Sequence, residues 1–207
     1  EVFDDTDLPI GNRIDTFLGL AIHEGCHVLY TDFSAYKGIT NGIVKFIENI
    51  LEDERIEREL GQKKPGLANF LKASKYYYFD RYSQKMKDEG KTEGLETFPR
   101  LMNAIISLVR YPKTVEMSDL EEFADTLLQV RDLLTPYPSS TAQCVETAEK
   151  IFEIIKQYLQ DAEKEKQKQQ ASDGSQDGQP SDKSGEGDGS SGQSQQSQSD
   201  GQQVKPK

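Results

Sequence analysis

The chain of 207 residues has few of the residues that mark secreted or membrane proteins. It contains only two cysteines, Cys26 and Cys144, which argues against the disulfide framework of a small extracellular domain. It has no apolar run long enough to span a bilayer, and its acidic first residues, EVFDD, are unlike a signal peptide. We therefore predict reduced thiols, a cytoplasmic setting and no membrane partner. Because the chain starts without methionine, we expect it to be a fragment of a longer protein.

Positive charge is also scarce. The 25 lysines and arginines are outnumbered by 36 acidic residues, which gives a formal net charge of −11. A surface of this sign repels the phosphates of DNA and RNA. The composition therefore predicts no nucleic-acid partner.

Aliphatic side chains almost disappear from the last forty residues, where only Ala171 and Val204 follow Gln169. A segment of glutamine, serine, glycine and aspartate cannot bury enough apolar surface to offset the entropy of ordering it. We therefore predict a single domain over residues 1–165, followed by a disordered Gln/Ser/Gly/Asp-rich linker over residues 166–207.

Hydrophobic periodicity predicts a mostly α-helical domain, with any strand confined to the first few residues. A first helix is expected over 14–30, with its apolar face buried and with Asn12 or Asp15 as its cap. A second is expected over 41–60, ended by Gly61.

Further helical segments are expected at 65–86 and 99–109. Two capping boxes, Ser118-x-x-Glu121 and Ser140-x-x-Gln143, predict the starts of the last two helices.

The two histidines of the chain stand four residues apart, in His23-Glu24-Gly25-Cys26-His27. In a helix, residues i and i+4 lie on one face, so both imidazoles can bind one metal ion. Glu24 then lies beside the metal, where it can take a proton from zinc-activated water and return it to the leaving amine. The pattern predicts a zinc-dependent peptidase with His23 and His27 as ligands and Glu24 as general base.

A catalytic zinc ion usually has three protein ligands, and the lack of a third histidine excludes the metzincin pattern. Cys26 points around the helix from the ligand face, so the third ligand is expected among Glu48, Glu52 and Asp53. Glu52 is the predicted ligand, because glutamate reaches further than aspartate and the 25 positions from His27 leave room for a turn. Asp53 or Glu48 then orients a ligand histidine, or is itself the ligand.

Three other acids of the second helix, Glu54, Glu57 and Glu59, are expected on a solvated face with pairs such as Glu54 and Arg58. Tyr77, within the run Tyr76-Tyr77-Tyr78, is a candidate donor to an oxyanion, although such runs more often belong to the core.

Two glycines, Gly19 and Gly25, fall inside the first predicted helix. Each costs about 1 kcal/mol relative to alanine in a helix, so a packing reason is expected. A close crossing by the second helix would supply one.

The stretches GLAIHEGCHVLYTDF and ENILEDERIE resemble the HExxH and N-x-x-E-D-x-R-x-E pair of bacterial and phage metallopeptidase-like proteins of the zincin (gluzincin) type. The resemblance covers about residues 19–57. It implies a zincin-like helical domain in which His23 and His27 bind zinc, Glu24 is the base, and Glu52 or Asp53 is the acidic ligand.

In that family the zincin domain often precedes a von Willebrand factor A domain, as in proteins related to the cobaltochelatase accessory subunit. The resemblance therefore implies that the tail leads toward such a domain, in the cytoplasm of a bacterial or phage-infected cell. The expected partner is a peptide or protein substrate. Two alternatives are a non-catalytic, zinc-stabilised adaptor working with an A-type domain and a MoxR-type AAA+ ATPase, and a virion or assembly protein. The strand that usually lies beside a zincin active-site helix is not visible in the sequence.

Overall fold

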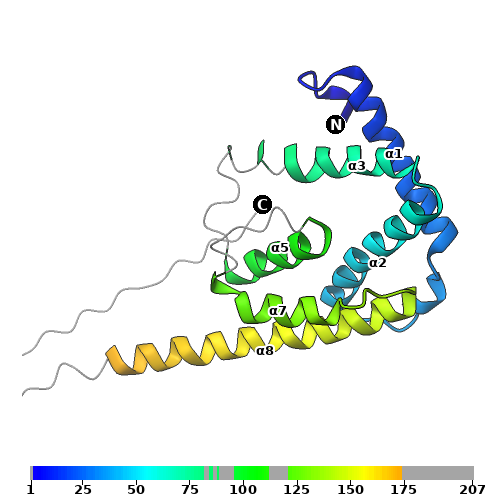
Figure 1. Ribbon diagram of the computed structural model, residues 1–207. Helices are drawn as coiled ribbons and strands as arrows, with labels where there is room; N and C mark the ends of the chain where they lie inside the picture. The colour runs from blue at the N-terminus through cyan, green and yellow to red at the C-terminus, as the bar shows by residue number, and fades with distance from the viewer. Residues whose placement is uncertain (1, 82–83, 86–87, 89–95, 112–120, 174–207) are drawn as a thin grey trace, which may run out of the picture. The chain divides into compact units, whose positions relative to one another are not determined.

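A computed structural model of the chain describes residues 2–81, 84–85, 88, 96–111 and 121–173, and these are mostly helical (Figure 1). No β-strand occurs among them, so the prediction of a mostly α-helical domain is confirmed. The chain divides into two units, residues 1–168 and 169–207, and the core belongs to the first. None of the described helices combines the length and hydrophobicity required to span a bilayer.

Helix α1 spans Ile10–Tyr30 and begins directly after Pro9, without a side-chain cap. The prediction that Asn12 or Asp15 caps this helix is wrong, because the first turn already forms before them, with the Arg13 amide donating to the Pro9 carbonyl at 3.1 Å. Proline suits this place, since the first helical amides have no partner within the helix.

Helix α2 spans Gly42–Lys63, and Asn41, where the helix was expected to begin, is its N-cap. The Asn41 side chain accepts hydrogen bonds from the amides of Ile43 and Val44, at 2.8 and 3.3 Å. Gly61 was expected to end the helix, but it remains helical and the chain turns only after Lys63. Glycine ends a helix where the backbone needs a positive φ, and Gly61 does not adopt one.

The remaining elements are short, apart from the last helix. They are η1 (Val2–Asp4), η2 (Phe33–Tyr36), α3 (Ala68–Lys75), the π-helical η3 (Tyr76–Arg81), α5 (Thr97–Arg110), α7 (Ala124–Leu133) and α8 (Thr141–Asp173). Helix α8 runs through the predicted domain boundary at residue 165.

The second predicted capping box is present in modified form at the start of α8. The Ser140 hydroxyl accepts from the Gln143 amide at 3.3 Å, while the Gln143 side chain accepts from the Ser139 amide at 2.8 Å. The other predicted box, at Ser118, lies outside the described residues.

The main core lies between α2, α5, α7 and α8 (Figure 1). Its fully buried members include Leu51 from α2, Ile105 from α5, Val130 from α7 and Ile151 from α8. Helix α2 therefore has one side in this core and offers another side to α1, where the histidines lie.

Helix α1 packs against α3 at a close crossing of small residues, and Cys26 and Ile22 of α1 share a hydrophobic cluster with Leu71 of α3. Thr16 and Gly19 are buried there, and the Ser74 hydroxyl of α3 donates to the Thr16 carbonyl at 3.0 Å. A Cβ atom at Gly19 would lie 2.1 Å from the Phe70 carbonyl oxygen. The expected packing reason for this glycine exists, but α3 supplies it, not α2.

The apolar face of α1 was expected to be buried, and this prediction is wrong. Six of its residues are 39% to 79% exposed, and we call them the outer stripe: Ile10, Ile14, Phe17, Leu18, Val28 and Leu29. The opposite face of the helix is buried instead. There α3 crosses so closely that only small residues such as Thr16 and Gly19 fit at the contact.

Candidate metal centre

The candidate centre lies between α1 and α2, which run antiparallel, so that two residues of each helix meet in matched pairs. His27 Nε2 lies 3.2 Å from Asp53 Oδ1, and His23 Nε2 lies 3.6 Å from the same oxygen. His23 Nδ1 lies 2.8 Å from Glu57 Oε1. The i, i+4 spacing of the histidines is therefore matched by the i, i+4 spacing of the two acids.

Each histidine ring has an oxygen partner at both nitrogens. The Nδ1 atom of His23 faces the Glu57 carboxylate, and that of His27 faces the Thr31 hydroxyl at 3.1 Å. Both Nε2 atoms face Asp53. A neutral imidazole carries only one proton, so if each Nδ1–H is donated outward, both Nε2 lone pairs point toward one carboxylate oxygen.

Two species can occupy that position favourably, namely additional protons or a cation. Protonation is one possibility, because the hydrogen bond to Asp53 raises the pKa of His27. A divalent metal between the two Nε2 atoms and Asp53 Oδ1 is the other.

The separations fit a metal. One ligand atom from each of His23, His27 and Asp53 lies within 4.8 Å of the others. Tetrahedral zinc with bonds of about 2.0 to 2.1 Å places its ligand atoms roughly 3.3 Å apart, close to the observed 3.2 and 3.6 Å. The outward Nδ1 hydrogen bonds also fix each ring with Nε2 inward, as in carboxylate–histidine–metal arrangements.

Glu57 is the most strongly stabilised anion of the centre. Burial alone would raise the pKa of this carboxyl group, but the hydrogen bond to His23 and the charges of Arg110 and Lys75 hold its pKa at about 2. Arg110 Nη2 lies 2.8 Å from Glu57 Oε1, and Lys75 Nζ lies 2.6 Å from Oε2. Glu57 therefore remains ionised and keeps the proton of His23 on Nδ1.

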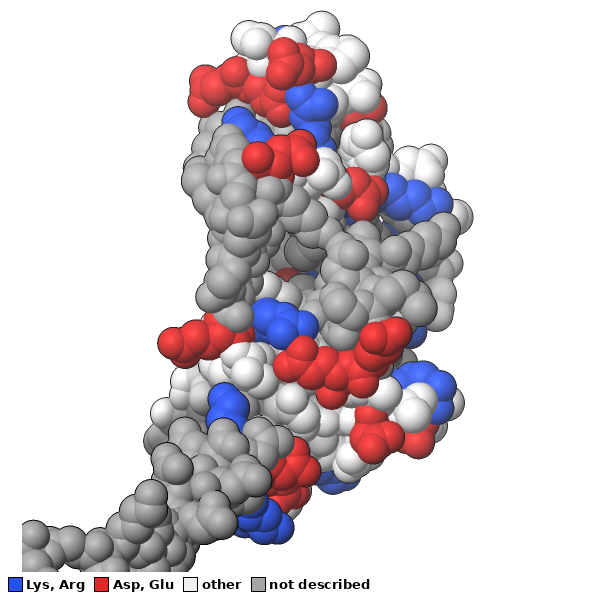
Figure 2. Space-filling model, turned by 90° about the vertical axis from the view of Figure 1, so that its left-hand side faces the viewer, with Lys and Arg blue, Asp and Glu red and all other residues white. Residues whose placement is uncertain are grey.

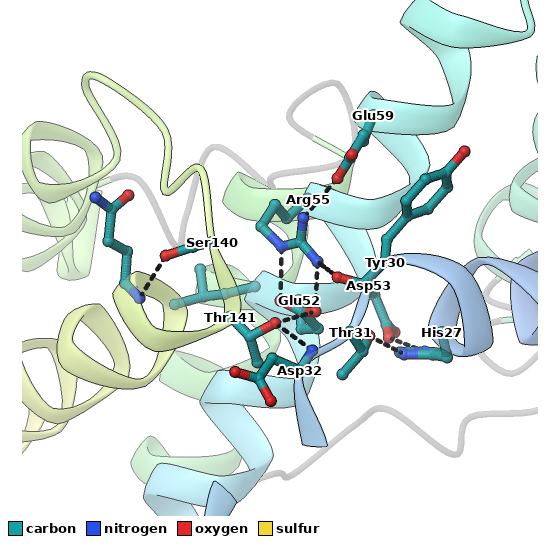
Figure 3. A network of polar contacts seen from close by, with 12 residues as sticks. His27, Tyr30, Thr31, Asp32, Glu52, Asp53, Arg55, Glu59, Ser140 and Thr141 are labelled. Carbon is teal, nitrogen blue, oxygen red and sulfur yellow. Dashed lines mark hydrogen bonds and ion pairs between the residues drawn. The ribbon is translucent and has the colours of Figure 1, made fainter. Parts of the chain in front are cut away.

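Glu52, the predicted third ligand, does not face the histidines. Figure 3 shows its carboxylate between Arg55 and Thr141, while Asp53 extends toward His27. Arg55 donates to both Glu52 oxygens, at 2.6 and 2.8 Å, and the Thr141 hydroxyl donates to Oε1 at 2.9 Å. The structure thus brings Asp53 to the histidine pair, because Asp53 lies about 100° further around the helix.

The Glu52 network joins three parts of the chain. Arg55 also donates to the Tyr30 carbonyl at 2.7 Å, which satisfies an unpaired acceptor at the end of α1. Thr141 Oγ1 in turn accepts from the Asp32 amide at 2.9 Å. The network therefore attaches the turn after α1 to α2 and to the start of α8.

Glu48, the remaining acidic candidate, is 2% exposed and lies one turn before Glu52. Burial, together with the nearby Glu52 charge, raises the pKa of Glu48 to about 7. Its Oε1 atom is buried with no hydrogen-bond partner among the described residues. Glu48 is not among the residues that the structure gathers around the histidines.

The other predicted site residues are placed as follows. Glu24 is exposed and follows the ligand candidate His23 directly, so its carboxylate is open to solvent beside the centre. Tyr77, the candidate oxyanion donor, is buried in a separate cluster with Val2 and Leu8. Cys26 is buried in the core on another side of α1, and burial raises the pKa of its thiol to about 11.

The sequence interpretation missed Glu57, which was expected on a solvated face together with Glu54 and Glu59. Glu54 does pair with Arg58, at 2.8 Å, but Glu54 and Glu57 are each only 8% exposed. The signal that identifies Glu57 is its spacing of four residues from Asp53, which repeats the spacing of the histidines.

Acidic side chains also gather away from the centre, near η1 (Figure 2). There Asp4, Asp5, Asp7 and Asp80 line a hollow between η1 and η3, and Arg81 pairs with Asp5 at 2.8 Å. Elsewhere on the face in Figure 2, basic and acidic side chains are interspersed among the described residues.

Comparison of the chain with family models, with curated proteins and with solved structures gave no match.

Proposed function

We propose that this chain is a zincin-like, zinc-dependent peptidase domain in which His23, His27 and Asp53 bind the metal. The observation that carries the proposal is the convergence of both Nε2 atoms on Asp53 Oδ1, with each Nδ1 held by its own oxygen partner. Compared with the sequence prediction, Asp53 replaces Glu52 as the third ligand, because the Glu52 carboxylate is already occupied by Arg55 and Thr141.

A zinc ion held by these ligands would make bound water acidic enough to attack a peptide bond near neutral pH. Glu24 is suited to the role of general base, because it follows His23 directly and its carboxylate is exposed to solvent. It would take the proton of the attacking water and deliver it to the leaving amine.

The residues around the ligands favour neutral histidines with inward lone pairs. Glu57 and Thr31 accept the Nδ1 protons of His23 and His27. The resemblance to bacterial and phage metallopeptidase-like proteins supports His23 and His27 as the ligands. The two free cysteines are compatible with the proposed setting, the cytoplasm of a bacterial or phage-infected cell.

The experiment combines metal analysis of the purified protein with turnover of a mixed peptide library. The wild-type chain should hold one zinc, and Glu24→Gln should hold it equally well while losing at least about a hundredfold in rate. Glu149→Gln, an exposed glutamate on α8, serves as the matched control and should leave the rate unchanged. Equal rates for wild type and Glu24→Gln would refute the general-base assignment.

A second candidate function is a non-catalytic, zinc-stabilised adaptor or assembly protein. The outer stripe on α1 favours it, because large exposed apolar patches mark protein interaction sites. The lack of a strand among the described residues also favours it, since a strand edge commonly aligns a peptide substrate. An A-type domain and a MoxR-type AAA+ ATPase are the partners proposed for that function. Zinc binding without turnover of any library peptide would support it.

A further inference from the structure

Arg110 stands at the C-terminal end of α5, a helix that supplies no candidate ligand, yet its guanidinium reaches the candidate centre. Its side chain is only 8% exposed. A buried guanidinium is unfavourable unless carboxylates surround it. The carboxylates that surround this one belong to Glu57 and Asp53, both on α2.

The first contact acts on His23. Arg110 Nη2 donates to Glu57 Oε1 at 2.8 Å, and the same oxygen lies 2.8 Å from His23 Nδ1. Two donors therefore converge on one carboxylate oxygen. The arrangement fixes Glu57 so that it can only accept from His23, and in the neutral imidazole a proton on Nδ1 leaves Nε2 without one.

The second contact acts on Asp53. Arg110 Nη1 lies 3.8 Å from Asp53 Oδ2, whereas the other oxygen, Oδ1, faces the two histidines. The Nη1 atom is buried. A donor near Oδ2 favours a carboxylate that presents Oδ1 alone to a cation.

We propose that Arg110 is a positioning residue that orients both the ligand carboxylate of Asp53 and, through Glu57, the ligand imidazole of His23. The inference rests on the proposed function, since it concerns the affinity of the same metal centre. Arginine is required, because its planar fork addresses two carboxylates at once. Lys75 supplies a comparison: its ammonium lies 2.6 Å from Glu57 Oε2 and 3.0 Å from Glu54, and it has no described contact with Asp53.

The test measures the zinc affinity of the full chain by competition with a chelator. Arg110→Met should weaken zinc binding by about 10- to 100-fold, the usual effect of losing a group that orients a metal ligand. Arg110→Lys retains the charge but cannot reach both carboxylates, so it should remain roughly tenfold weaker than wild type. Arg100→Met on the same helix, where the arginine pairs with Glu122 at 2.7 Å, is the matched control and should bind as wild type does.

A spectroscopic readout separates positioning from simple support of the fold. With Co²⁺ in place of zinc, the visible absorption bands report ligand geometry, so Arg110→Lys should shift them and Arg100→Met should not. If Arg110→Met does not fold, Arg110→Lys decides the question alone.

The outcomes are distinct. Wild-type affinity and an unchanged Co²⁺ spectrum in Arg110→Lys would overturn this inference, as would unchanged zinc affinity in a folded Arg110→Met. Absence of zinc binding by the wild-type chain would overturn the proposed function and this inference with it. Weak zinc binding in both Arg110 variants with a normal Arg100→Met supports it.

Discussion

Adding a single methyl group at two glycines of α1 should have opposite effects on stability. A Cβ atom at Gly19 would lie 2.0 Å from Ser74 Oγ and 2.1 Å from the Phe70 carbonyl oxygen, whereas one at Gly25 would meet nothing within 4 Å. Both glycines are six residues apart in the same helix, so the intrinsic gain from alanine is the same, about 1 kcal/mol.

The magnitudes follow from what each methyl group meets. At Gly19 the obstacle is backbone, which cannot rotate away, so α3 must move and its hydrogen bond from Ser74 to Thr16 is disturbed. Overpacking usually costs about 1 to 3 kcal/mol and here falls at or above the upper end. After the helix-propensity gain, Gly19→Ala should destabilise by about 2 kcal/mol or more, and Gly25→Ala should stabilise by about 1 kcal/mol.

The assay is reversible unfolding of the metal-free chain, with chelator present so that changes at the centre do not contribute. In a domain of this size each kcal/mol shifts the melting temperature by about 2 to 4 °C. Gly19→Ala should therefore melt roughly 4 to 8 °C lower, and Gly25→Ala about 2 to 4 °C higher. If the melting temperatures of the two variants shift in the same direction, or if Gly19→Ala melts at the wild-type temperature, α1 and α3 do not pack as closely as described.

Four further outcomes are expected. Chelation should lower the melting temperature of the purified chain, because a metal bound only by the folded state stabilises it. Zinc affinity should fall as the pH is lowered, because protons compete for His27, whose pKa the hydrogen bond to Asp53 raises; a melt indifferent to zinc would contradict the centre. Asp53→Ala should abolish tight zinc binding. Glu52→Ala should mainly destabilise the metal-free fold, by about 1 to 3 kcal/mol, because buried Arg55 loses two hydrogen bonds and keeps only Glu59 and the Tyr30 carbonyl as partners; the reverse pattern would restore Glu52 as ligand. Glu48→Gln should stabilise the metal-free chain by up to about 3 kcal/mol at pH 8 and hardly at all at pH 4. The pKa of the Glu48 carboxyl group rises from about 4.3 in the unfolded chain to about 7 in the folded one, so the free energy of unfolding of the wild type falls as pH rises through that range. An effect of Glu48→Gln that does not change with pH in unfolding experiments would rule this out.

The sequence was sufficient to locate the helices, though not their exact ends, and one half of the candidate centre. Hydrophobic periodicity located α2, the capping box at Ser140 located the start of α8, and the i, i+4 histidines defined one face of candidate ligands. These features are local, and the physics of a single helix decides them.

The choice between Glu52 and Asp53 could not be predicted, because it depends on the rotation of α2 about its own axis. That rotation is set by the core residues facing α5, α7 and α8, which are distant in sequence. The length of the side chain does not decide which acid faces the histidines; the side of α2 that the core occupies does. The buried Glu57 was missed for the same reason, since its partner Arg110 comes from a helix 53 residues later in the chain.

The outer stripe was also mispredicted, because periodicity identifies an apolar face without indicating what covers it. Residues such as Phe17 and Val28 are 50% and 79% exposed. The buried side of α1 carries Thr16 and Gly19, residues whose small size matters more than their polarity.

The antiparallel pairing of α1 and α2 has a consequence for the order of folding. The three ligand candidates and the two residues that hold the ring nitrogens all fall between His23 and Glu57, within one helical hairpin whose connection runs from residue 31 to residue 41. Closing so short a loop costs little entropy, and contacts of low sequence separation form early. We therefore expect the hairpin to capture a metal ion before α8 docks, so that in hydrogen exchange with zinc present the central amides of α1 and α2 open last.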